Sequence, residues 1–182
     1  ISEAALLDEV AALPASDLQN APTFLPYLSG ERTPHNDPFA QGVFFGMNNE
    51  TARAHLGYAV LEGVAFGLAD GLAALQSAGT VVNTLSLVGG GSRSPYWSQL
   101  IADALNTPLC THDGSAAGGA LGAARLGWLA AGGDEAIVCV KPPLSASFQP
   151  DPARHAALQS RLARFRALYL QLRPMFAAPA AA

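Results

Sequence analysis

The fold is decided by residues 85–95, which read Leu-Ser-Leu-Val-Gly-Gly-Gly-Ser-Arg-Ser-Pro. An apolar run of this kind, bounded by turn formers, predicts a buried strand over residues 84–88. The three glycines end the strand. Pro95 then suits the first turn of a helix, because its missing N–H would have no helical partner there. The stretch therefore predicts a strand, a tight turn and a helix in succession.

The glycine turn itself favours an anion site. Without Cβ atoms, Gly89, Gly90 and Gly91 can adopt positive φ and bring their backbone close to a ligand. Their free N–H groups, with a helix N-terminus behind them, suit a phosphate, and Ser92 and Ser94 can add hydroxyl donors. The same pattern also fits a simple strand–helix turn in which Ser94 is the N-cap. The residues alone leave both interpretations open.

A second glycine-rich segment follows the next predicted strand. Residues 114–125 read Gly-Ser-Ala-Ala-Gly-Gly-Ala-Leu-Gly-Ala-Ala-Arg and open a helix of small residues. Two such turns on neighbouring strand–helix units can flank one flat or anionic ligand, such as an adenosine. Small residues also allow a helix to pack tightly against a sheet, and that alternative stays open.

The glycine turn partly matches the fingerprint of dinucleotide-dependent oxidoreductases. Gly89 and Gly91 have the required spacing, and Asp113 follows the next strand, where such domains carry an acid for the ribose. However, Ser94 stands where the third glycine belongs, and more than 80 residues precede a strand that would normally begin its domain. The Gly-Lys-Ser/Thr sequence of a phosphate-binding P-loop does not occur.

Alternating periodicities predict an α/β domain around this stretch. Helices are predicted over residues 1–13 with Ser2 as N-cap, from Asn48 or Asn49 to about Gly79, and over 95–105, 116–131 and 153–172. Strands are predicted over residues 43–45, 84–88 and 108–111, an edge strand or extended loop over 24–28, and a loop over 141–152.

Three glycines of the longest predicted helix, Gly63, Gly67 and Gly71, lie four residues apart. Each costs about 0.8–1 kcal/mol against Ala in a helix. Glycine is the residue that lets a neighbouring backbone approach most closely. The spacing therefore predicts close backbone contact along this face of the helix.

Composition narrows the class of protein. The chain has 182 residues, a formal net charge of −4 and 13% charged residues, while half of its residues are hydrophobic. This excludes intrinsic disorder, and the mild acidity without a polybasic patch argues against nucleic-acid and anionic-membrane partners. The longest apolar stretch, residues 52–78, carries Arg53, His55, Glu62 and Asp70, which argues against a membrane span.

The cysteines and the first residues indicate the setting of the chain. Cys110 and Cys139 form no metal-ligand pattern and predict two core thiols in a reducing, cytoplasmic compartment. The chain opens Ile1-Ser2-Glu3 without an initiator Met. We therefore expect it to be processed or to begin within a longer protein.

Four further patterns carry a family resemblance. They are residues 24–35 (Phe-Leu-Pro-Tyr-Leu-Ser-Gly-Glu-Arg-Thr-Pro-His), residues 42–62 (Gly-Val-Phe-Phe-Gly-Met, then His-Leu-Gly-Tyr-Ala-Val-Leu-Glu), residues 87–103 (the glycine turn, then Trp97, Gln99 and Ala102-Asp103) and residues 120–126 (Ala-Leu-Gly-Ala-Ala-Arg-Leu). As a set they resemble the FGGY family of carbohydrate kinases, over roughly residues 24–174. The first pattern is most similar to the kinases that act on xylulose.

One departure from the family pattern is visible. The family often has an acid and then Gly-Pro before Ala-Leu-Gly-Ala-Ala. Here Ala116 and Gly119 stand at the positions of the acid and the proline. A role that the family gives to that acid, or to a rigid turn, is therefore not carried over to this chain.

The resemblance implies a fold of two ribonuclease H-like domains, as in actin and hexokinase, with ATP between them. Residues 24–174 would be the later part of the C-terminal, nucleotide-binding domain, after a segment and linker over 1–23 and before a frayed tail over 175–182. The catalytic Asp and most sugar contacts would lie on an N-terminal domain before Ile1. No catalytic residue and no metal ligand is therefore assigned in this chain.

The reaction that the resemblance implies is transfer of the γ-phosphoryl group of ATP to D-xylulose, with Mg²⁺ on the triphosphate. Gluconate, glycerol, fuculose and rhamnulose kinases share the nucleotide half, and members of the family are often dimers. The expected nucleotide contacts in this chain are Gly89, Gly90, Gly91, Ser92, Ser94, Gln99, Gly118 and Gly119.

The remaining polar residues are expected to be structural. Glu31 and Arg32 should pair and hold their loop, although with His35 they could also approach a cleft. Glu62 should be a hydrogen-bonded carboxylate within the longest helix, because an unpaired buried charge is costly. Asp103 is expected to pair or cap locally, and Trp97 to belong to the core rather than stack on adenine. No role is assigned to His55, His112 and His155.

Overall fold

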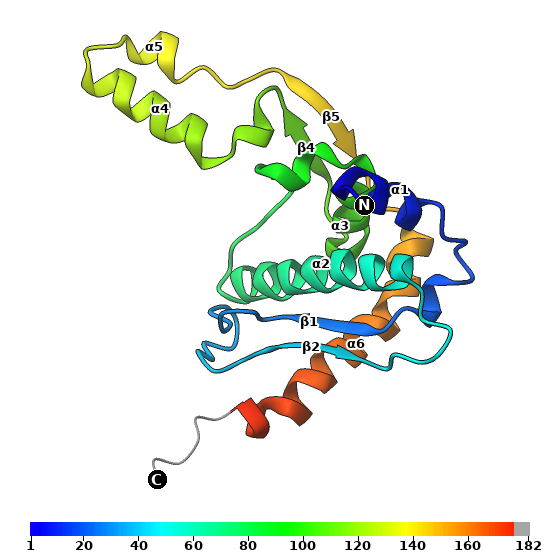
Figure 1. Cartoon of the computed structure of the whole chain (residues 1–182). Helices are drawn as coiled ribbons and strands as arrows, with labels where there is room; N and C mark the ends of the chain where they lie inside the picture. Colours follow the sequence, from blue (N-terminus) through cyan, green and yellow to red (C-terminus); the bar gives the residue numbers. More distant parts are fainter. Residues whose placement is uncertain (177–182) are drawn as a thin grey trace.

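The computed structural model describes residues 1–176 as a body of helices and strands with a helical arm (Figure 1). Its helices are α1 (Glu3–Ala11), α2 (Arg53–Ser77), α3 (Pro95–Leu105), α4 (Gly119–Ala130), α5 (Glu135–Val138) and α6 (Pro152–Phe176). Its strands are β1 (Thr23–Pro26), β2 (Gly42–Phe45), β3 (Leu85–Ser86), β4 (Leu109–His112) and β5 (Leu144–Phe148). Short 3-10 turns cover Leu18–Asn20, Gly90–Arg93 and Ser115–Ala117.

The strands form two small sheets. β1 and β2 pair antiparallel, with Thr23 opposite Phe45. The second sheet has the order β3-β4-β5, in which β3 runs parallel to β4 and β5 runs antiparallel to it. A parallel pair needs a crossover connection, and α3 supplies it between β3 and β4. The α/β class predicted from the sequence is therefore confirmed.

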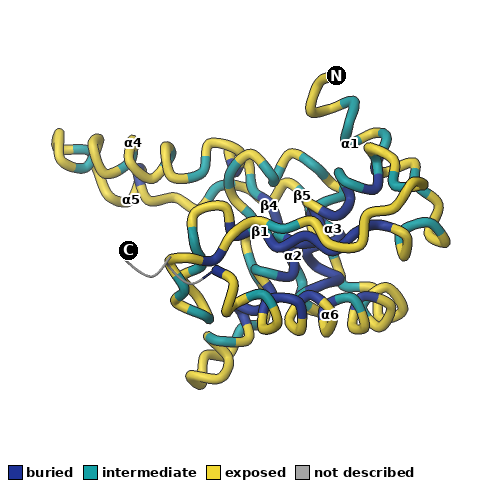
Figure 2. The backbone as a smooth tube through the Cα atoms, turned by 60° about the horizontal axis from the view of Figure 1, so that its bottom comes forward, coloured by how far each residue is buried: buried dark blue, intermediate teal, exposed yellow. Residues whose placement is uncertain are grey.

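The core lies where α2 and α6 pack with β1 and α3 (Figure 2). The rings of Phe66 on α2 and Phe165 on α6 meet edge to face, with centroids 5.6 Å apart. Fully burying one such side chain contributes about 1.5–3 kcal/mol. The last helix presents one apolar face to this core, where five of its residues are buried: Leu158, Leu162, Phe165, Leu168 and Tyr169.

α2 is the one helix in residues 1–176 that is long and apolar enough, by length and composition, to cross a membrane. However, 56% of its most apolar window is buried inside the protein. Two of its acids are paired with arginines of α6: Glu62 with Arg161 at 2.6 Å, and Asp70 with Arg166 at 2.7 Å. These contacts make α2 the central helix of the core.

Two helices begin where their capping residues predict. The Ser2 hydroxyl accepts a hydrogen bond from the N–H of Ala5 at 3.2 Å, at the start of α1. The Ser94 hydroxyl accepts one from the N–H of Trp97, also at 3.2 Å, at the start of α3. Each bond satisfies a backbone donor that has no partner within the helix. The bounds predicted for α3 are confirmed at both ends.

Several other boundaries differ from the prediction. α2 begins at Arg53 rather than at Asn48 or Asn49, because Asn48 closes a turn instead: its N–H donates to the Thr51 hydroxyl at 3.0 Å. Residues 144–148 form β5, which pairs with β4, where a loop is predicted. The loop is predicted because prolines lie on both sides of this short strand. β3 is shorter than the five residues predicted, and α6 is longer than predicted.

The last helix continues to the end of the described residues. Met175 and Phe176 continue α6, whereas residues 177–182 of the predicted tail lie outside the described residues.

Both cysteines are free thiols, with Cys110 buried and Cys139 exposed. The prediction of two core thiols is therefore wrong for Cys139, which follows α5 on the projecting arm.

The three glycines within α2 have different surroundings. A Cβ atom at Gly63 would collide with the carbonyl oxygen of Phe24 in β1. At Gly67 it would meet only the Cγ atom of Pro26, at 3.9 Å, and at Gly71 nothing lies within 4 Å. The predicted close approach of a backbone is confirmed at Gly63 and wrong at the other two positions.

We expect Gly63→Ala to lower the free energy of unfolding by about 1–3 kcal/mol, because the β1 backbone must move to admit a methyl group. Gly71→Ala is the matched control. It should raise the free energy of unfolding by up to about 1 kcal/mol, since Ala is the better helix former and its methyl group has space. Chemical denaturation followed by circular dichroism measures both. Equal effects would contradict the packing of α2 on β1.

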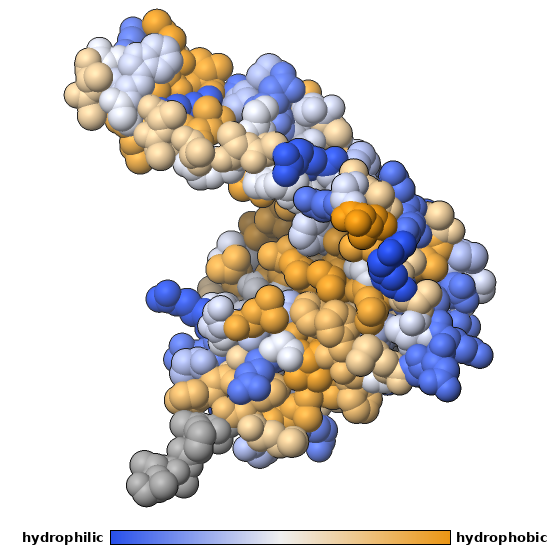
Figure 3. All heavy atoms as spheres, viewed as in Figure 1, coloured by the Kyte–Doolittle hydropathy of each residue, from blue (hydrophilic) through white to orange (hydrophobic). Residues whose placement is uncertain are grey.

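Two surfaces of the molecule remain strongly apolar. α4 and α5 form an arm that projects from the body (Figure 1), and α4 has no buried residue. On this arm, Leu126, Trp128 and Ile137 are each more than half exposed. On the body, apolar residues gather over α2 and the neighbouring strands (Figure 3), where Phe45 and Val60 are exposed. Contiguous apolar surface of this kind is typical of an interface.

Candidate functional site

The first glycine turn connects β3 to α3. Gly89 has φ +94°, in the region that favours glycine, and residues 90–93 make one 3-10 turn before Ser94 caps α3. The Ser92 hydroxyl donates a hydrogen bond to the Gly89 carbonyl at 2.8 Å and so closes the turn on itself. The predicted succession of strand, turn and helix is confirmed, with Ser94 as the N-cap.

The second glycine turn connects β4 to α4. Gly114 and Gly118 both have positive φ, and residues 115–117 form a 3-10 turn between them. The Ser115 hydroxyl accepts the N–H of His112 at 2.7 Å, which ties the turn to the end of β4. The helix predicted over residues 116–131 is therefore divided at Gly118, and α4 begins at Gly119.

The two turns lie against each other. The N–H of Gly89 donates to the Ser115 carbonyl at 2.8 Å. A Cβ atom at Gly118 would lie only 3.3 Å from the Cα atom of Gly89. β3 and β4 are adjacent and parallel, so their carboxyl ends open at the same edge of the sheet, where α/β proteins commonly bind ligands. The predicted proximity of the two turns is confirmed.

A cavity of about 290 Å³ lies beside the second turn, with Gly118 among its lining residues. Two cations, Arg125 and Lys141, line it together with one acid, Asp113. Arg125 is held in place because its Nη2 donates to the Val140 carbonyl at 2.7 Å. Cations at the mouth of a cavity attract anionic ligands. No sequence signal predicts Lys141 here, since its position depends on how the chain returns from α5.

A larger cavity of about 770 Å³ lies on the side of the first turn. Gly90, Gly91, Ser94 and Trp97 line it, together with mostly apolar residues of α1, α2 and β2. Its volume falls within the range of about 300–1,000 Å³ that is usual for small-molecule sites. Among the residues predicted for the nucleotide, Gly90, Gly91 and Ser94 therefore line this cavity and Gly118 lines the smaller one, whereas Gly89, Ser92 and Gly119 line neither.

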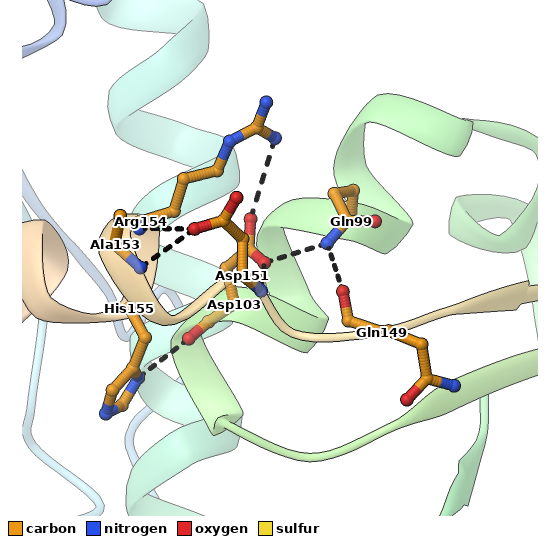
Figure 4. A network of polar contacts seen from close by, with 7 residues as sticks. All are labelled: Gln99, Asp103, Gln149, Asp151, Ala153, Arg154 and His155. Atoms are coloured by element: carbon orange, nitrogen blue, oxygen red, sulfur yellow. Dashed lines mark hydrogen bonds and ion pairs between the residues drawn. The ribbon is translucent and has the colours of Figure 1, made fainter.

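Gln99 is not brought to the glycine turns. Figure 4 shows it in a network around Asp103 that joins α3 to the start of α6. The Gln99 Nε2 atom donates to Asp103 Oδ1 and to the Gln149 carbonyl, both at 2.8 Å, and the Asp151 N–H donates to Asp103 Oδ1 at 2.8 Å. Gln99 also lines a third cavity with Arg154. Asp103 pairs locally with Gln99, as predicted, and also binds a distant segment.

Glu62 is a hydrogen-bonded structural carboxylate, as predicted. Arg161 donates from Nε and Nη2 to its two oxygens at 2.6 and 2.7 Å, and the Glu62 side chain is only 2% exposed. Burial raises the pKa of Glu62, and the Arg161 guanidinium opposes that shift. Arg161 also donates to the Ala21 carbonyl at 3.1 Å, so it fixes α6 to both α2 and the segment before β1.

The charged loop after β1 is held differently from the prediction. The Glu31 carboxylate accepts the backbone N–H of His35 at 2.7 Å, and the His35 ring stacks on Tyr169 with centroids 3.8 Å apart. Within residues 1–176, no ion pair joins Glu31 to Arg32, so the predicted pair is wrong. The partner of the Glu31 carboxylate is instead the backbone N–H of His35.

The three histidines without an assigned role also have definite places. His55 caps α2, because its Nδ1 atom accepts the N–H of Ala52 at 3.0 Å. His155 forms a hydrogen bond with the Asp103 carbonyl at 2.8 Å. His112 lines the 290 Å³ cavity beside the second glycine turn. Only His112 therefore lies near the glycine turns.

Residues 2–131 match a family model described as the C-terminal domain of the FGGY family of carbohydrate kinases. The chain belongs to this family. The FGGY match answers the alternative left open by the glycine pattern, because it places the chain among kinases and not among dinucleotide-dependent oxidoreductases. The resemblance inferred from the four sequence patterns is confirmed.

Individual FGGY proteins resemble the chain over nearly its whole length. The xylulose kinase of Escherichia coli (strain K12) is 46% identical over 171 residues, which are 92% of this chain and 35% of that protein. A crystal structure described as a xyloylose kinase from Brucella ovis superimposes with a TM-score of 0.77 at 44% identity, covering 94% of this chain and 35% of the other. The gluconate kinase of Lactobacillus acidophilus gives a TM-score of 0.74 at 28% identity, covering 94% and 35%.

These FGGY neighbours define the fold and the extent of the match. The fold is that of the C-terminal part of an FGGY kinase, which has the actin- and hexokinase-like architecture, as predicted. The chain spans about a third of the length of the relatives that it matches, 35% in each of these three cases.

Proposed function

We propose that this chain is the nucleotide-binding part of an ATP-dependent kinase that phosphorylates D-xylulose. The observation that carries the proposal is the backbone contact between two glycine turns, Gly89 to Ser115, at the carboxyl ends of two parallel strands in an FGGY chain. Xylulose is favoured as the sugar because identity to kinases of that name reaches 46%, against 38% for a glycerol kinase and 28% for the gluconate kinase. Glycerol, fuculose and rhamnulose kinases are the related alternatives.

In this proposal the chain binds and orients ATP. The backbone N–H groups of Gly90 and Gly91 and the N-terminus of α3 supply donors for phosphate or ribose oxygens, whereas the N–H of Gly89 is held by the Ser115 carbonyl. Ser94 lines the larger cavity and Gly118, just before Gly119 at the start of α4, lines the smaller one, where Arg125 and Lys141 add positive charge. Fixed donors of this kind align the γ-phosphoryl group for in-line transfer to a sugar hydroxyl.

Proton transfer is proposed to come from outside this chain. An Asp of an N-terminal domain would accept the proton of the sugar hydroxyl as general base. That domain is also the proposed partner of the exposed apolar surfaces on α2, β2 and the α4–α5 arm. Closure of the two domains on the substrates would exclude water from the transfer. A homodimer is a further proposed assembly.

Mg²⁺ is proposed to arrive bound to the triphosphate. Residues 1–176 contain no group of three or more His, Cys, Asp or Glu side chains that could hold a metal ion. Mg²⁺ in kinases is usually held by phosphate oxygens and one or two carboxylates, and it neutralises charge on the phosphoryl group.

A cytoplasmic location is proposed for the protein, since both cysteines are free thiols.

A chimeric kinase tests the proposed function. The matched third of the Escherichia coli xylulose kinase is replaced by this chain, and ADP release is measured with D-xylulose and ATP. We expect sugar-dependent ATP turnover by the chimera, whereas the isolated 182-residue chain should bind ATP weakly and show no turnover, because its general base is supplied elsewhere. A folded chimera without turnover, or turnover by the isolated chain, would contradict the proposal.

The choice of sugar is tested by a second chimera. The same replacement is made in the gluconate kinase of Lactobacillus acidophilus, which is less similar to this chain. We expect lower relative activity there, because the surfaces that meet the rest of the kinase are matched less well. Higher relative activity in the gluconate kinase would favour that branch of the family over xylulose.

A further inference from the structure

Trp97 connects the first glycine turn to the central helix. It lies in the first turn of α3, where its backbone N–H donates to the Ser94 hydroxyl at 3.2 Å. Its indole Nε1–H donates to the Leu61 carbonyl of α2 at 3.0 Å. The ring is partly buried and packs against the hydrophobic core, as predicted for this residue. One side chain therefore ties the start of α3 to the middle of α2.

The other contact of Trp97 is with the turn itself. A Cβ atom at Gly91 would lie 2.9 Å from Cε3 and 3.3 Å from Cη2 of the Trp97 ring, so the indole packs directly on the backbone of Gly91. The Gly91 carbonyl in turn accepts the N–H of Ser94 at 3.1 Å. Trp97 also lines the 770 Å³ cavity together with Gly90 and Gly91. The ring thus contacts the backbone of the turn and also borders the cavity that the turn lines.

We propose that Trp97 is a positioning residue that fixes the backbone of Gly90 and Gly91 relative to α2 and so determines the affinity for nucleotide. This inference rests on the proposed function. Three successive glycines have unusual conformational freedom, and an ordered arrangement of their N–H groups would otherwise cost affinity on binding. The indole restricts that freedom by contact with Gly91 and by its hydrogen bond to Leu61.

Trp97→Phe tests this role because it removes the indole N–H and keeps an aromatic ring. ATP affinity of the 182-residue chain is measured by calorimetric titration. We expect the Kd for ATP to rise about fivefold to tenfold, the loss associated with one hydrogen bond. The matched control is Trp128→Phe on α4, where the side chain is exposed and the Kd should not change. In the xylulose kinase chimera, Trp97→Phe should raise the KM for ATP and leave kcat and the KM for xylulose unchanged.

A merely structural Trp97 gives a different result. It would lower the thermal midpoint without changing the Kd or KM for ATP, and that outcome would overturn the inference. The outcome also differs from failure of the proposed function, in which the unmodified chain does not bind ATP and the unmodified chimera is inactive. If the unmodified chain binds ATP and Trp97→Phe binds it with the same Kd, only the positioning role of Trp97 is rejected.

A double-mutant cycle tests the contact with Gly91 separately. Gly91→Ala forces the Trp97 ring away from the turn and should weaken ATP binding. In a Trp97→Leu background the methyl group has space, so Gly91→Ala should have little further effect. Additive effects of the two substitutions would contradict direct support of the turn by the ring.

Fluorescence provides a measurement that does not depend on changing Trp97. The chain has two tryptophans, so Trp128→Phe leaves Trp97 as the single emitter. We expect its emission to shift in proportion to ATP saturation, because the ring borders the cavity and contacts Gly91. Unchanged emission at saturating ATP would overturn the inference even if Trp97→Phe does not fold.

Discussion

Replacing Arg161 with Met is expected to lower the free energy of unfolding by about 3–5 kcal/mol at neutral pH. The substitution leaves the Glu62 carboxylate, which is 2% exposed, without the two hydrogen bonds that now hold it at 2.6 and 2.7 Å. Arg161 itself is mostly buried, with 15% of its side chain exposed, so solvent screens the pair little. The pair also joins α6 to α2, and its loss weakens the core contact between them.

The loss should shrink as the pH is lowered. Burial already raises the pKa of Glu62, and the guanidinium is the main group that opposes that shift, so without it the pKa of Glu62 in the folded variant rises further. The unfolded chain keeps the ordinary glutamate value of 4.5. A raised folded pKa means that the folded variant is favoured most below that ordinary value, and that this advantage disappears as the pH rises through the folded pKa. Urea denaturation at several pH values between about 4 and 8 measures this dependence.

Two comparisons identify the buried pair as the cause. The double variant Glu62→Leu with Arg161→Met removes both charges and should recover most of the lost stability, because apolar replacement of a buried pair is often neutral. Arg53→Met breaks the exposed pair with Glu9 and should change stability far less. An Arg161→Met variant with wild-type stability, or with the same loss at every pH, would contradict this description of the core.

Gly118→Ala is expected to weaken ATP binding more than about tenfold, which corresponds to about 1.4 kcal/mol. Gly118 has φ +52° and ψ −131°, a conformation that other residues adopt only with strain of about 1–3 kcal/mol. Its new Cβ atom would also lie 3.3 Å from the Cα and 3.4 Å from the N atom of Gly89. The Gly89 backbone would have to shift by a few tenths of an ångström, and we expect this shift to weaken the hydrogen bond from Gly89 to Ser115.

Gly127→Ala is the matched control for this substitution. It lies within α4, the helix that follows Gly118, and a Cβ atom there would meet nothing within 4 Å. It should leave ATP affinity unchanged and stabilise the helix by up to about 1 kcal/mol. Calorimetric titration of both variants with ATP measures the two affinities. Equal affinities of the Gly118 and Gly127 variants would show that the contact between the turns does not control the nucleotide site.

The sequence predicted those features that depend on residues close together in the chain. Ser94 and Pro95 define the start of α3, because capping and proline geometry act within one helical turn. The three glycines after β3 indicated a backbone turn for the same reason. β5 was missed although its residues, Leu-Ser-Ala-Ser-Phe, alternate between apolar and polar, because prolines flank this short run and its pairing partner β4 lies more than thirty residues away.

The long-range parts of the site could not be predicted from the sequence. The hydrogen bond from Gly89 to Ser115 and the position of Lys141 depend on how separate strand–helix units pack, which no local pattern encodes. Gln99 was included because it belongs to the family pattern around the turn, but its amide is engaged by Asp103 and Gln149. Its place among the nucleotide contacts stays a prediction, as do the predicted domain limits.

The central claim is that the two adjoining glycine turns together bind ATP. Its most direct test is a nuclear magnetic resonance titration of the ¹⁵N-labelled chain with ATP. We predict that the largest amide shifts fall in residues 89–92 and 115–119, and that both sets follow one binding curve. Largest shifts around Gln99 and Asp103, or no shifts in either turn at saturating ATP, would contradict it.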